Sequence, residues 1–137
     1  MILKPQLPQT TSGLKAAQQM VRQFHLKYEC TVHDDRFTPD ATMEERDFRK
    51  SLITEEYKEL MRAMDAQDAV EIADQLADLT YVILGTAVAY GIDLDRVFAE
   101  VHRSNMTKVP PGKHNSKPLK GVNYERPQIA QILYGGA

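Results

Sequence analysis

The sequence is poor in cysteine and in long apolar runs. Its single cysteine, Cys30, has no partner within the 137 residues, so we expect no internal disulfide, a packed thiol and a reducing, cytoplasmic compartment. No apolar run reaches the roughly eighteen residues that a membrane-spanning helix needs. Residues 1–5 lack the charged and apolar regions of a signal peptide. We therefore expect one cytoplasmic domain over residues 1–137 and no membrane partner.

The sequence also lacks internal repeats, strand-like alternation of useful length and an overall basic charge. The net charge is −2, so nucleic acid is not an expected partner. Charge is divided along the chain: residues 44–78 hold eleven acids against five Lys and Arg, whereas residues 96–137 hold seven Lys and Arg against two acids. Such a division favours an anionic ligand, bound through cations and the basic segment together.

Apolar residues at helical spacing predict four main helices and a short fifth one. The boundary signals are a capping box at Thr42 and Glu45, a C-terminal stop at Gly91 and an N-cap at Asp93. The expected helices cover residues 14–28, residues 42 to about 64, residues 69–90, a segment after Asp93, and residues 128–133 with Pro127 at their start.

Prolines after Thr107 exclude long helices in the last part of the chain. We predict an all-α fold, in which an antiparallel four-helix unit follows an irregular lead-in over residues 1–12. Residues 107–137 form an irregular, basic C-terminal arm. Residues 31–41, which hold several acids and a proline, are expected to form a loop.

Two stripes of carboxylates are the most informative feature of the sequence. Their members stand three or four residues apart, a spacing that places side chains on one face of a helix. The first stripe consists of Glu55, Glu56 and Glu59, and the second of Glu71, Asp74 and Asp78. Like charges stacked in this way repel, and a hard cation such as Mg²⁺ or Mn²⁺ would relieve the repulsion. The alternative is a solvated acidic face.

A short turn near Asp65 and Asp68 joins the two helices that carry the stripes. The helices must then run antiparallel, which brings the stripes opposite each other in one oxygen-rich cluster that faces inward. Asp78 borders a nearly continuous apolar run, where a carboxylate is unfavourable without a partner or a metal. This setting favours a metal site over a solvated face.

The acidic motifs and the segment after Gly91 resemble a known family. Residues 55–59 match its first signature, which is two adjacent Glu and a third Glu three residues after the second. Residues 71–79 resemble its second signature. Residues 91–93 and 101–108 match its fourth-helix segment. Over roughly Thr42 to Leu133 the chain is similar to the all-α nucleoside triphosphate pyrophosphohydrolase superfamily, which includes MazG-like proteins, dimeric dUTPases and phosphoribosyl-ATP pyrophosphohydrolases.

The resemblance implies hydrolysis of a nucleoside triphosphate between its α and β phosphates, giving the monophosphate and pyrophosphate. It also implies two or three Mg²⁺ or Mn²⁺ ions per site and assembly as a homodimer or homotetramer with composite sites. We assign Glu55 as the general base and expect the metal ligands to be Glu56, Glu59, Asp78 and one or both of Glu71 and Asp74. Many relatives have an acid where this chain has Gln75, so the choice between Glu71 and Asp74 stays open.

The expected substrate contacts come from the fourth helix and the arm. The resemblance offers Asn105 and Lys108 as phosphate contacts, although a lysine without the motif would more often be solvated. Arg103 is a weaker candidate, and Lys120 and Tyr124 of the arm could close over phosphate or base. The shared motifs do not include the residues that read the base, and we lean to a purine deoxynucleoside triphosphate.

Three other functions compete with this one. A catalytically inactive nucleotide-binding or regulatory helical module is the main alternative, although loss of activity would be expected to remove the carboxylates first. A di-iron carboxylate bundle would need a Glu followed three residues later by a His, and none of the four His satisfies this. A His-Asp phosphodiesterase is disfavoured because His33-Asp34 stands in a predicted loop without further His partners.

Overall fold

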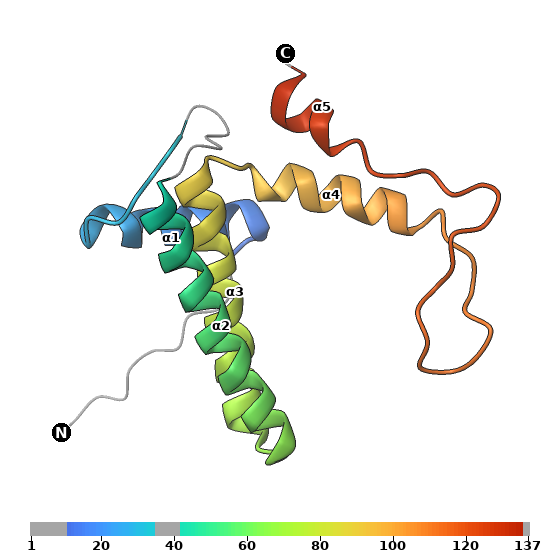
Figure 1. Ribbon diagram of the computed structural model, residues 1–137, viewed down its shortest axis with the longest axis horizontal. Helices are drawn as coiled ribbons and strands as arrows, with labels where there is room; N and C mark the ends of the chain where they lie inside the picture. The colour runs from blue at the N-terminus through green and yellow to red at the C-terminus, as the bar shows by residue number, and fades with distance from the viewer. Residues whose placement is uncertain (1–10, 35–41, 136–137) are drawn as a thin grey trace.

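The computed structural model describes residues 11–34 and 42–135, and within these ranges the protein is helical (Figure 1). The helices are α1 (Leu14–Lys27), α2 (Met43–Asp65), α3 (Ala69–Tyr90), α4 (Leu94–Asn105) and α5 (Ile129–Tyr134). The described residues contain no strand, only an isolated antiparallel bridge between Val109 and Leu119. The predicted all-α fold is confirmed. Most of the predicted lead-in, and the predicted loop from residue 35 on, lie outside the described residues.

The helix boundaries follow from the predicted capping residues. Thr42 caps α2 by accepting a bond from the amide of Glu45 at 3.2 Å, and Asp68 and Asp93 cap α3 and α4 in the same way. Gly91 ends α3 in the left-handed conformation, with φ of 70°, which lets the chain turn without steric strain. Helices α1 and α5 begin without a side-chain cap, and α5 begins two residues after Pro127.

The main body consists of α1, α2 and α3. Helices α2 and α3 form an antiparallel hairpin, and α1 crosses α3 (Figure 1). The core is small: Val21, Leu84 and Val88 are buried together where α1 meets α3. Helix α4 leaves this body, packing mainly on α1 and α5, and the arm lies at its far end (Figure 1).

Several apolar side chains that were expected to be buried are exposed in the single chain. Phe24 of α1 and Phe48 of α2 are 42% and 47% exposed, and Phe98 of α4 is 62% exposed. A single chain of this shape has too few neighbouring helices to cover both faces of α2 and α3. Exposed large apolar side chains of this kind often mark a surface that contacts another molecule.

Helix α3 is long and apolar enough to cross a membrane by length and composition, with a mean hydropathy of 1.2. This differs from the expectation that no such segment exists. A single helix of this kind is weak evidence, because the core helix of a soluble protein has the same properties. Here α3 is the central helix of the body and contacts both α1 and α2.

Candidate functional site

The structure brings carboxylates of α2 and α3 together around Glu56. Glu56 is half-buried on α2, and its pKa is raised above the usual range. Burial is the largest cause, followed by the charge of Asp78 across the helix pair and then by those of Glu55, Glu59 and Asp74. The two predicted stripes therefore lie opposite each other, as an antiparallel hairpin requires.

Glu71 lies nearer the turn between the helices than the other acids. It shares a hollow of about 200 Å³ with Glu59, Arg62 and Asp68. The guanidinium of Arg62 donates to Glu59 at 2.8 Å, so this carboxylate already has a positive neighbour. Glu71 is not among the groups that raise the pKa of Glu56, whereas Asp74 is. This geometry favours Asp74 over Glu71 as a member of the central cluster.

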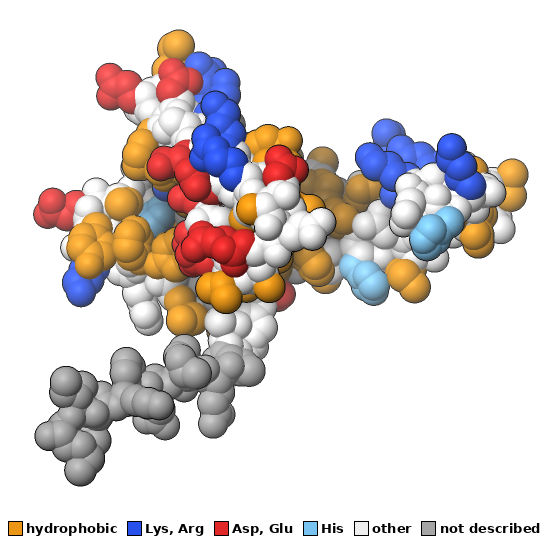
Figure 2. All heavy atoms as spheres, turned by 90° about the horizontal axis from the view of Figure 1, so that it is seen from below, with side chains coloured by type: hydrophobic (Ala, Val, Ile, Leu, Met, Phe, Trp, Pro, Cys, Tyr) orange, Lys and Arg blue, Asp and Glu red, His pale blue; other side chains and the backbone are white. Residues whose placement is uncertain are grey.

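The cluster lies on the surface of the hairpin, so the prediction that it faces inward is wrong for the single chain. Glu56 and Asp78 are half-buried, while the other four acids are exposed. Figure 2 shows acidic side chains on the surface of the main body and basic side chains on the projecting arm. The reason is that no third helix within the described residues covers α2 and α3 on this side.

The side chain of Gln75 indicates independently that the hairpin lacks a bonding partner. Its side-chain oxygen Oε1 is buried and has no hydrogen-bond partner within the described ranges. A buried polar atom without a partner is unfavourable by about 1–3 kcal/mol. Gln75 lies on α3 about one turn before Asp78. An unpartnered oxygen here would be satisfied by a donor or a cation.

The carboxylate oxygens of the cluster suit a hard divalent cation as ligands, although the side chains are not gathered around one point. Within residues 11–34 and 42–135, no three His, Cys, Asp or Glu side chains are close enough together to hold an ion. Carboxylates that repel each other turn apart unless a positive charge draws them in. The oxygens of Glu56, Asp78, Glu55, Glu59 and Asp74 are ligands of the type that Mg²⁺ and Mn²⁺ prefer.

The structure does not bring the expected substrate contacts to the carboxylates of the same chain. Asn105 and Lys108 stand at the far end of α4, and Lys120 and Tyr124 belong to the arm beyond it (Figure 1). The ammonium of Lys120 lies 5.1 Å from the ring centre of Tyr124. A bond to Ser104 is the main reason that the pKa of the Tyr124 phenol is lowered.

Arg103, for which a substrate contact was predicted, joins the arm to α4. Its guanidinium donates to both oxygens of Glu100, at 2.7 and 3.0 Å, and to Glu125 of the arm at 3.2 Å. The bonds from Arg103 to Glu100, together with one from the amide of Gln128, lower the pKa of Glu100 to about 2. We call Glu100, Arg103, Glu125 and Gln128 the clasp. Arg103 therefore bonds other members of the clasp and also lines a hollow of about 440 Å³ between α4 and α5.

Further bonds order the arm beside the clasp. The hydroxyl of Ser104, which is buried, donates to the carbonyl of Glu125 at 2.8 Å, and the amide of Glu125 donates to Thr107 at 2.9 Å. Val109 and Leu119 exchange backbone bonds of 2.8 and 2.9 Å, closing a loop between them. The arm is therefore irregular, as predicted, but held in one arrangement against α4.

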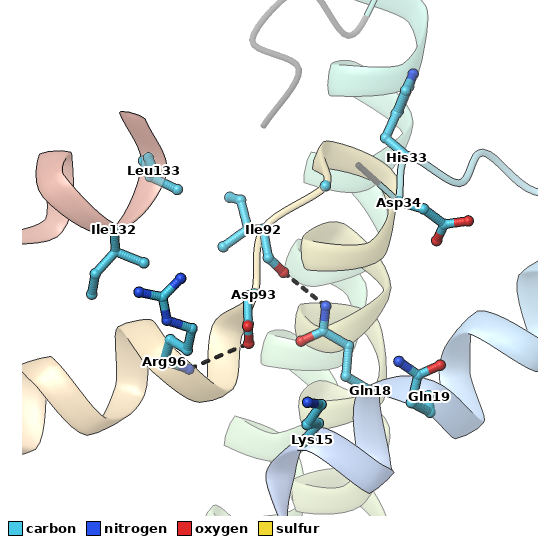
Figure 3. A pocket seen from close by; sticks show the side chains of 11 residues that line it. Lys15, Gln18, Gln19, His33, Asp34, Ile92, Asp93, Arg96, Ile132 and Leu133 are labelled. Carbon is cyan, nitrogen blue, oxygen red and sulfur yellow. Dashed lines mark hydrogen bonds between the residues drawn. The ribbon is translucent and has the colours of Figure 1, made fainter. Parts of the chain in front are cut away.

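A separate polar pocket of about 330 Å³ lies between α1, α4 and α5 (Figure 3). Lys15 and Arg96 line it from two different helices. Gln18 bridges to the start of α4: its amide nitrogen donates to the carbonyl of Ile92 at 2.7 Å, and its oxygen accepts from the amide of Leu94 at 3.2 Å. No motif predicted this pocket. It lies at the C-terminal end of α3, away from the two carboxylate stripes of α2 and α3.

Two buried polar residues near the cluster were also not predicted. Arg49 of α2 and His25 of α1 are 4% and 2% exposed. Both contact α3 at Gly85, where an added Cβ would collide with the Arg49 guanidinium and lie 3.0 Å from Nε2 of His25. The only sequence signals are the arginine in an otherwise apolar stripe and the small residue at position 85.

Comparison with known proteins adds a family assignment to this geometry. A model of the phosphoribosyl-ATP pyrophosphohydrolase family matches residues 21–105. The match begins earlier than the expected similarity, includes all six acids of the two stripes, and ends before Lys108 and the arm. A search of curated proteins finds no match. Because the match covers more than half of the chain, the protein belongs to the phosphoribosyl-ATP pyrophosphohydrolase family of the all-α MazG-like superfamily and is a pyrophosphohydrolase.

Proposed function

We propose that the protein hydrolyses a nucleoside or deoxynucleoside triphosphate at the α–β phosphate bond, with Mg²⁺ or Mn²⁺ as cofactor and the monophosphate and pyrophosphate as products. The observation that carries this proposal is the crowding at Glu56, where burial and four neighbouring acids raise its pKa. Acids crowded around a half-buried carboxylate repel each other; bound cations would relieve this repulsion and could in turn hold the phosphates. Among such substrates the proposal favours a purine deoxynucleoside triphosphate.

The residues divide into ligands and a base. Glu56 and Asp78, which are half-buried and opposite each other, would hold two or three ions with Glu59 and with Asp74 or Glu71. When bound, the ions neutralise phosphate charge and orient a water in line with the bond to be cleaved. Glu55 lies beside Glu56 on α2 and is exposed, so it is available to accept the proton of that water.

We further propose that the active assembly is a cytoplasmic homodimer or homotetramer with shared sites. Asn105, Lys108, Lys120 and Tyr124 are remote from the carboxylates of their own chain, so they would serve those of another copy. The exposed apolar side chains of α1, α2 and α4 support association, because burying them in water-excluded contacts is favourable. A second copy would also cover the acidic surface of the hairpin.

The direct test is incubation with each common NTP and dNTP, and with phosphoribosyl-ATP, in the presence of Mg²⁺ or Mn²⁺ and then of a chelator. Monophosphate plus pyrophosphate, lost with the chelator, is the expected result. Diphosphate plus phosphate would contradict the proposed bond. Turnover of phosphoribosyl-ATP alone would contradict the proposed substrate class. No turnover of any nucleotide would leave a nucleotide-binding module.

Matched variants separate the site from general charge effects. Asp78→Asn is expected to lower turnover at least about a hundredfold, because removal of a metal-holding carboxylate removes charge stabilisation in the transition state. Asp65→Asn, at the end of α2 and outside the central cluster, is expected to retain turnover. Equal activity in the two variants would contradict the metal assignment.

A further inference from the structure

The polar pocket between α1, α4 and α5 has no part in the chemistry proposed for the carboxylates. Its volume of about 330 Å³ lies within the range of about 300–1,000 Å³ that is usual for sites of small organic molecules. Lys15 reaches it from α1, Arg96 from α4 and Ile132 from α5 (Figure 3). A ligand in this pocket would therefore contact three helices at once.

The acids and the histidine of the pocket wall already have partners. Both carboxylate oxygens of Asp34 accept from the guanidinium of Arg22, at 2.7 and 2.6 Å, and these bonds are the main cause that lowers the pKa of Asp34. Asp93 is the N-cap of α4 and accepts from the backbone amide of Arg96 at 3.4 Å. His33 donates from Nδ1 to the carbonyl of Ala89 at 2.6 Å. The negative groups of the wall are thus engaged within the protein.

The two cations of the wall, in contrast, have free donors. Within the described residues, the ammonium of Lys15 and the guanidinium of Arg96 form no hydrogen bond or ion pair. Lysine and arginine side chains have donors only, so the group that they can bind is an acceptor. A negatively charged acceptor forms the stronger bonds with both. The unused polar groups therefore favour an anion.

The geometry favours a phosphate group with an organic part attached. A phosphate monoester has three terminal oxygens for two cations on different helices, whereas a carboxylate has two, and the planar guanidinium suits paired phosphate oxygens. The pocket also has an apolar side, formed by Ile92 and by Ile132 and Leu133 of α5 (Figure 3). An inorganic anion would leave this apolar side in contact with water.

We propose that this pocket is an effector site for a phosphate monoester of a small organic molecule, such as a nucleoside monophosphate, and that binding there fixes α4 relative to α1. The phosphate bonds Lys15 and Arg96 together, and the organic part lies against Ile132 and Leu133. Residues 91–93, which connect α3 to α4, belong to the same wall. Because α4 packs mainly on α1 and α5, a ligand that joins all three adds to the contacts that set its direction.

The effect on turnover rests on the proposed function, whereas the binding itself does not. Under that proposal α4 carries Asn105, and Lys108 follows it, so a ligand at the base of α4 changes how both reach the substrate. The reaction also releases a nucleoside monophosphate. The same molecule would then be product at the carboxylates and effector at this pocket.

The first test is titration calorimetry of the protein with dAMP in the presence of a chelator. Without cations the acidic cluster repels phosphate, so the heat of binding reports on another site. We expect one dAMP per chain. Deoxyadenosine, which has no phosphate, should not bind, and inorganic phosphate should bind more weakly than dAMP. No binding of dAMP would overturn the inference, and equal binding of inorganic phosphate would contradict the role of the apolar side.

Variants locate the binding site. Lys15→Gln and Arg96→Gln, both at exposed side chains and checked for helix content, should each raise the Kd for dAMP at least about tenfold, because each removes a charged hydrogen bond. Lys113→Gln, which removes an exposed cation of the arm, and Asp78→Asn, at the acidic cluster, should keep the wild-type Kd. A similar loss in Lys113→Gln or Asp78→Asn, or no loss in Lys15→Gln and Arg96→Gln, would overturn the assignment.

Hydrogen exchange tests whether the ligand holds α4. At ten times its Kd, dAMP occupies most of the pockets and should slow amide exchange in residues 94–105, with exchange in α2 unchanged. Arg96→Gln at the same dAMP concentration should lose most of this effect. Binding that leaves exchange in α4 unchanged would contradict the effector role and leave only a binding site.

The results also separate this inference from the proposed function. Turnover of nucleoside triphosphates by a protein that does not bind dAMP under chelation would overturn the pocket and leave the reaction standing. Binding of dAMP that depends on Lys15 and Arg96, in a protein without turnover, would support the pocket and contradict the reaction.

Discussion

Glu56 is a carboxylate whose surroundings favour its protonated form. Burial and the charges of Asp78, Glu55, Glu59 and Asp74 raise its pKa in the folded protein. Its ionised form therefore lowers the stability of the metal-free protein at pH values above that pKa, and the loss is relieved as the pH falls through it. The half-buried position of Glu56 and its raised pKa both indicate a functional role.

Glu56→Gln is therefore expected to have opposite effects on stability and on activity. Without metal the variant should melt at the same temperature as the wild type or higher near pH 7, because the repulsion is gone. Its turnover should fall at least about a hundredfold if Glu56 holds a cation. Thermal melts at pH 4 and pH 7 check the first part, since the stability difference should shrink at the lower pH. A variant that melts lower at pH 7 would contradict the repulsion.

Gln75→Glu tests the unpartnered oxygen in the hairpin. A sixth acid at the central cluster should lower the melting temperature of the metal-free protein by several degrees, corresponding to about 1–2 kcal/mol. Saturating Mg²⁺ or Mn²⁺ should then raise the melting temperature more in this variant than in the wild type. Calorimetry with and without metal makes the comparison. An equal metal-induced shift in both proteins would place Gln75 outside the cation site.

At the scale of elements, the helix boundaries could be predicted because their signals are local. Thr42, Asp68 and Asp93 start helices and Gly91 ends one through contacts within four residues. The antiparallel pairing of α2 and α3 also follows from their short connection. The clasp could not be predicted in the same way, because Arg103 meets Glu125 across 22 residues of irregular chain. The hollow lined by Phe24, Phe48 and Tyr81 likewise depends on how α1, α2 and α3 meet.

Glu100→Gln tests whether the clasp holds the arm on α4. The pKa of Glu100 is about 2, below its ordinary value of 4.5, so its contribution to stability is present above pH 4.5 and is lost as the pH falls towards 2. The variant should show faster amide hydrogen exchange in residues 121–128 at pH 7, with exchange in α2 and α3 unchanged. The difference from the wild type should narrow below pH 4.5. Glu44→Gln, at an exposed acid of α2, serves as the control.

At the scale of the whole molecule, the single chain has acids and lysines at separate ends. Glu56 and Asp78 lie on the hairpin, whereas Lys108 lies beyond α4 (Figure 1). The sequence could place the acids on helices and Lys108 at the start of the arm, but it could not show that one chain keeps them apart, because that depends on the direction in which α4 leaves Gly91. It also could not show which apolar side chains remain exposed.

A complementation experiment tests whether sites are shared between copies. Asp78→Asn and Lys108→Ala should each be nearly inactive alone. After unfolding and refolding together at equal amounts, a shared-site dimer should recover about a quarter of wild-type activity, because half of the dimers are mixed and each has one intact site. The same mixture at a concentration that favours monomers should be inactive. No recovery, in a mixture shown to contain hybrid dimers, would place all groups of a site within one chain.

The short connection between α3 and α4, at residues 91–93, has a mechanical consequence. Gln18 bonds this connection on both sides, at Ile92 and Leu94, and the twelve-residue helix then extends about 18 Å away. A rotation of about 10° at such a pivot moves the far end by about 3 Å, more than the alignment of a reacting phosphate tolerates. A small change in the angle of α4 at this connection therefore displaces Asn105 and Lys108, whose proposed role is to contact phosphate.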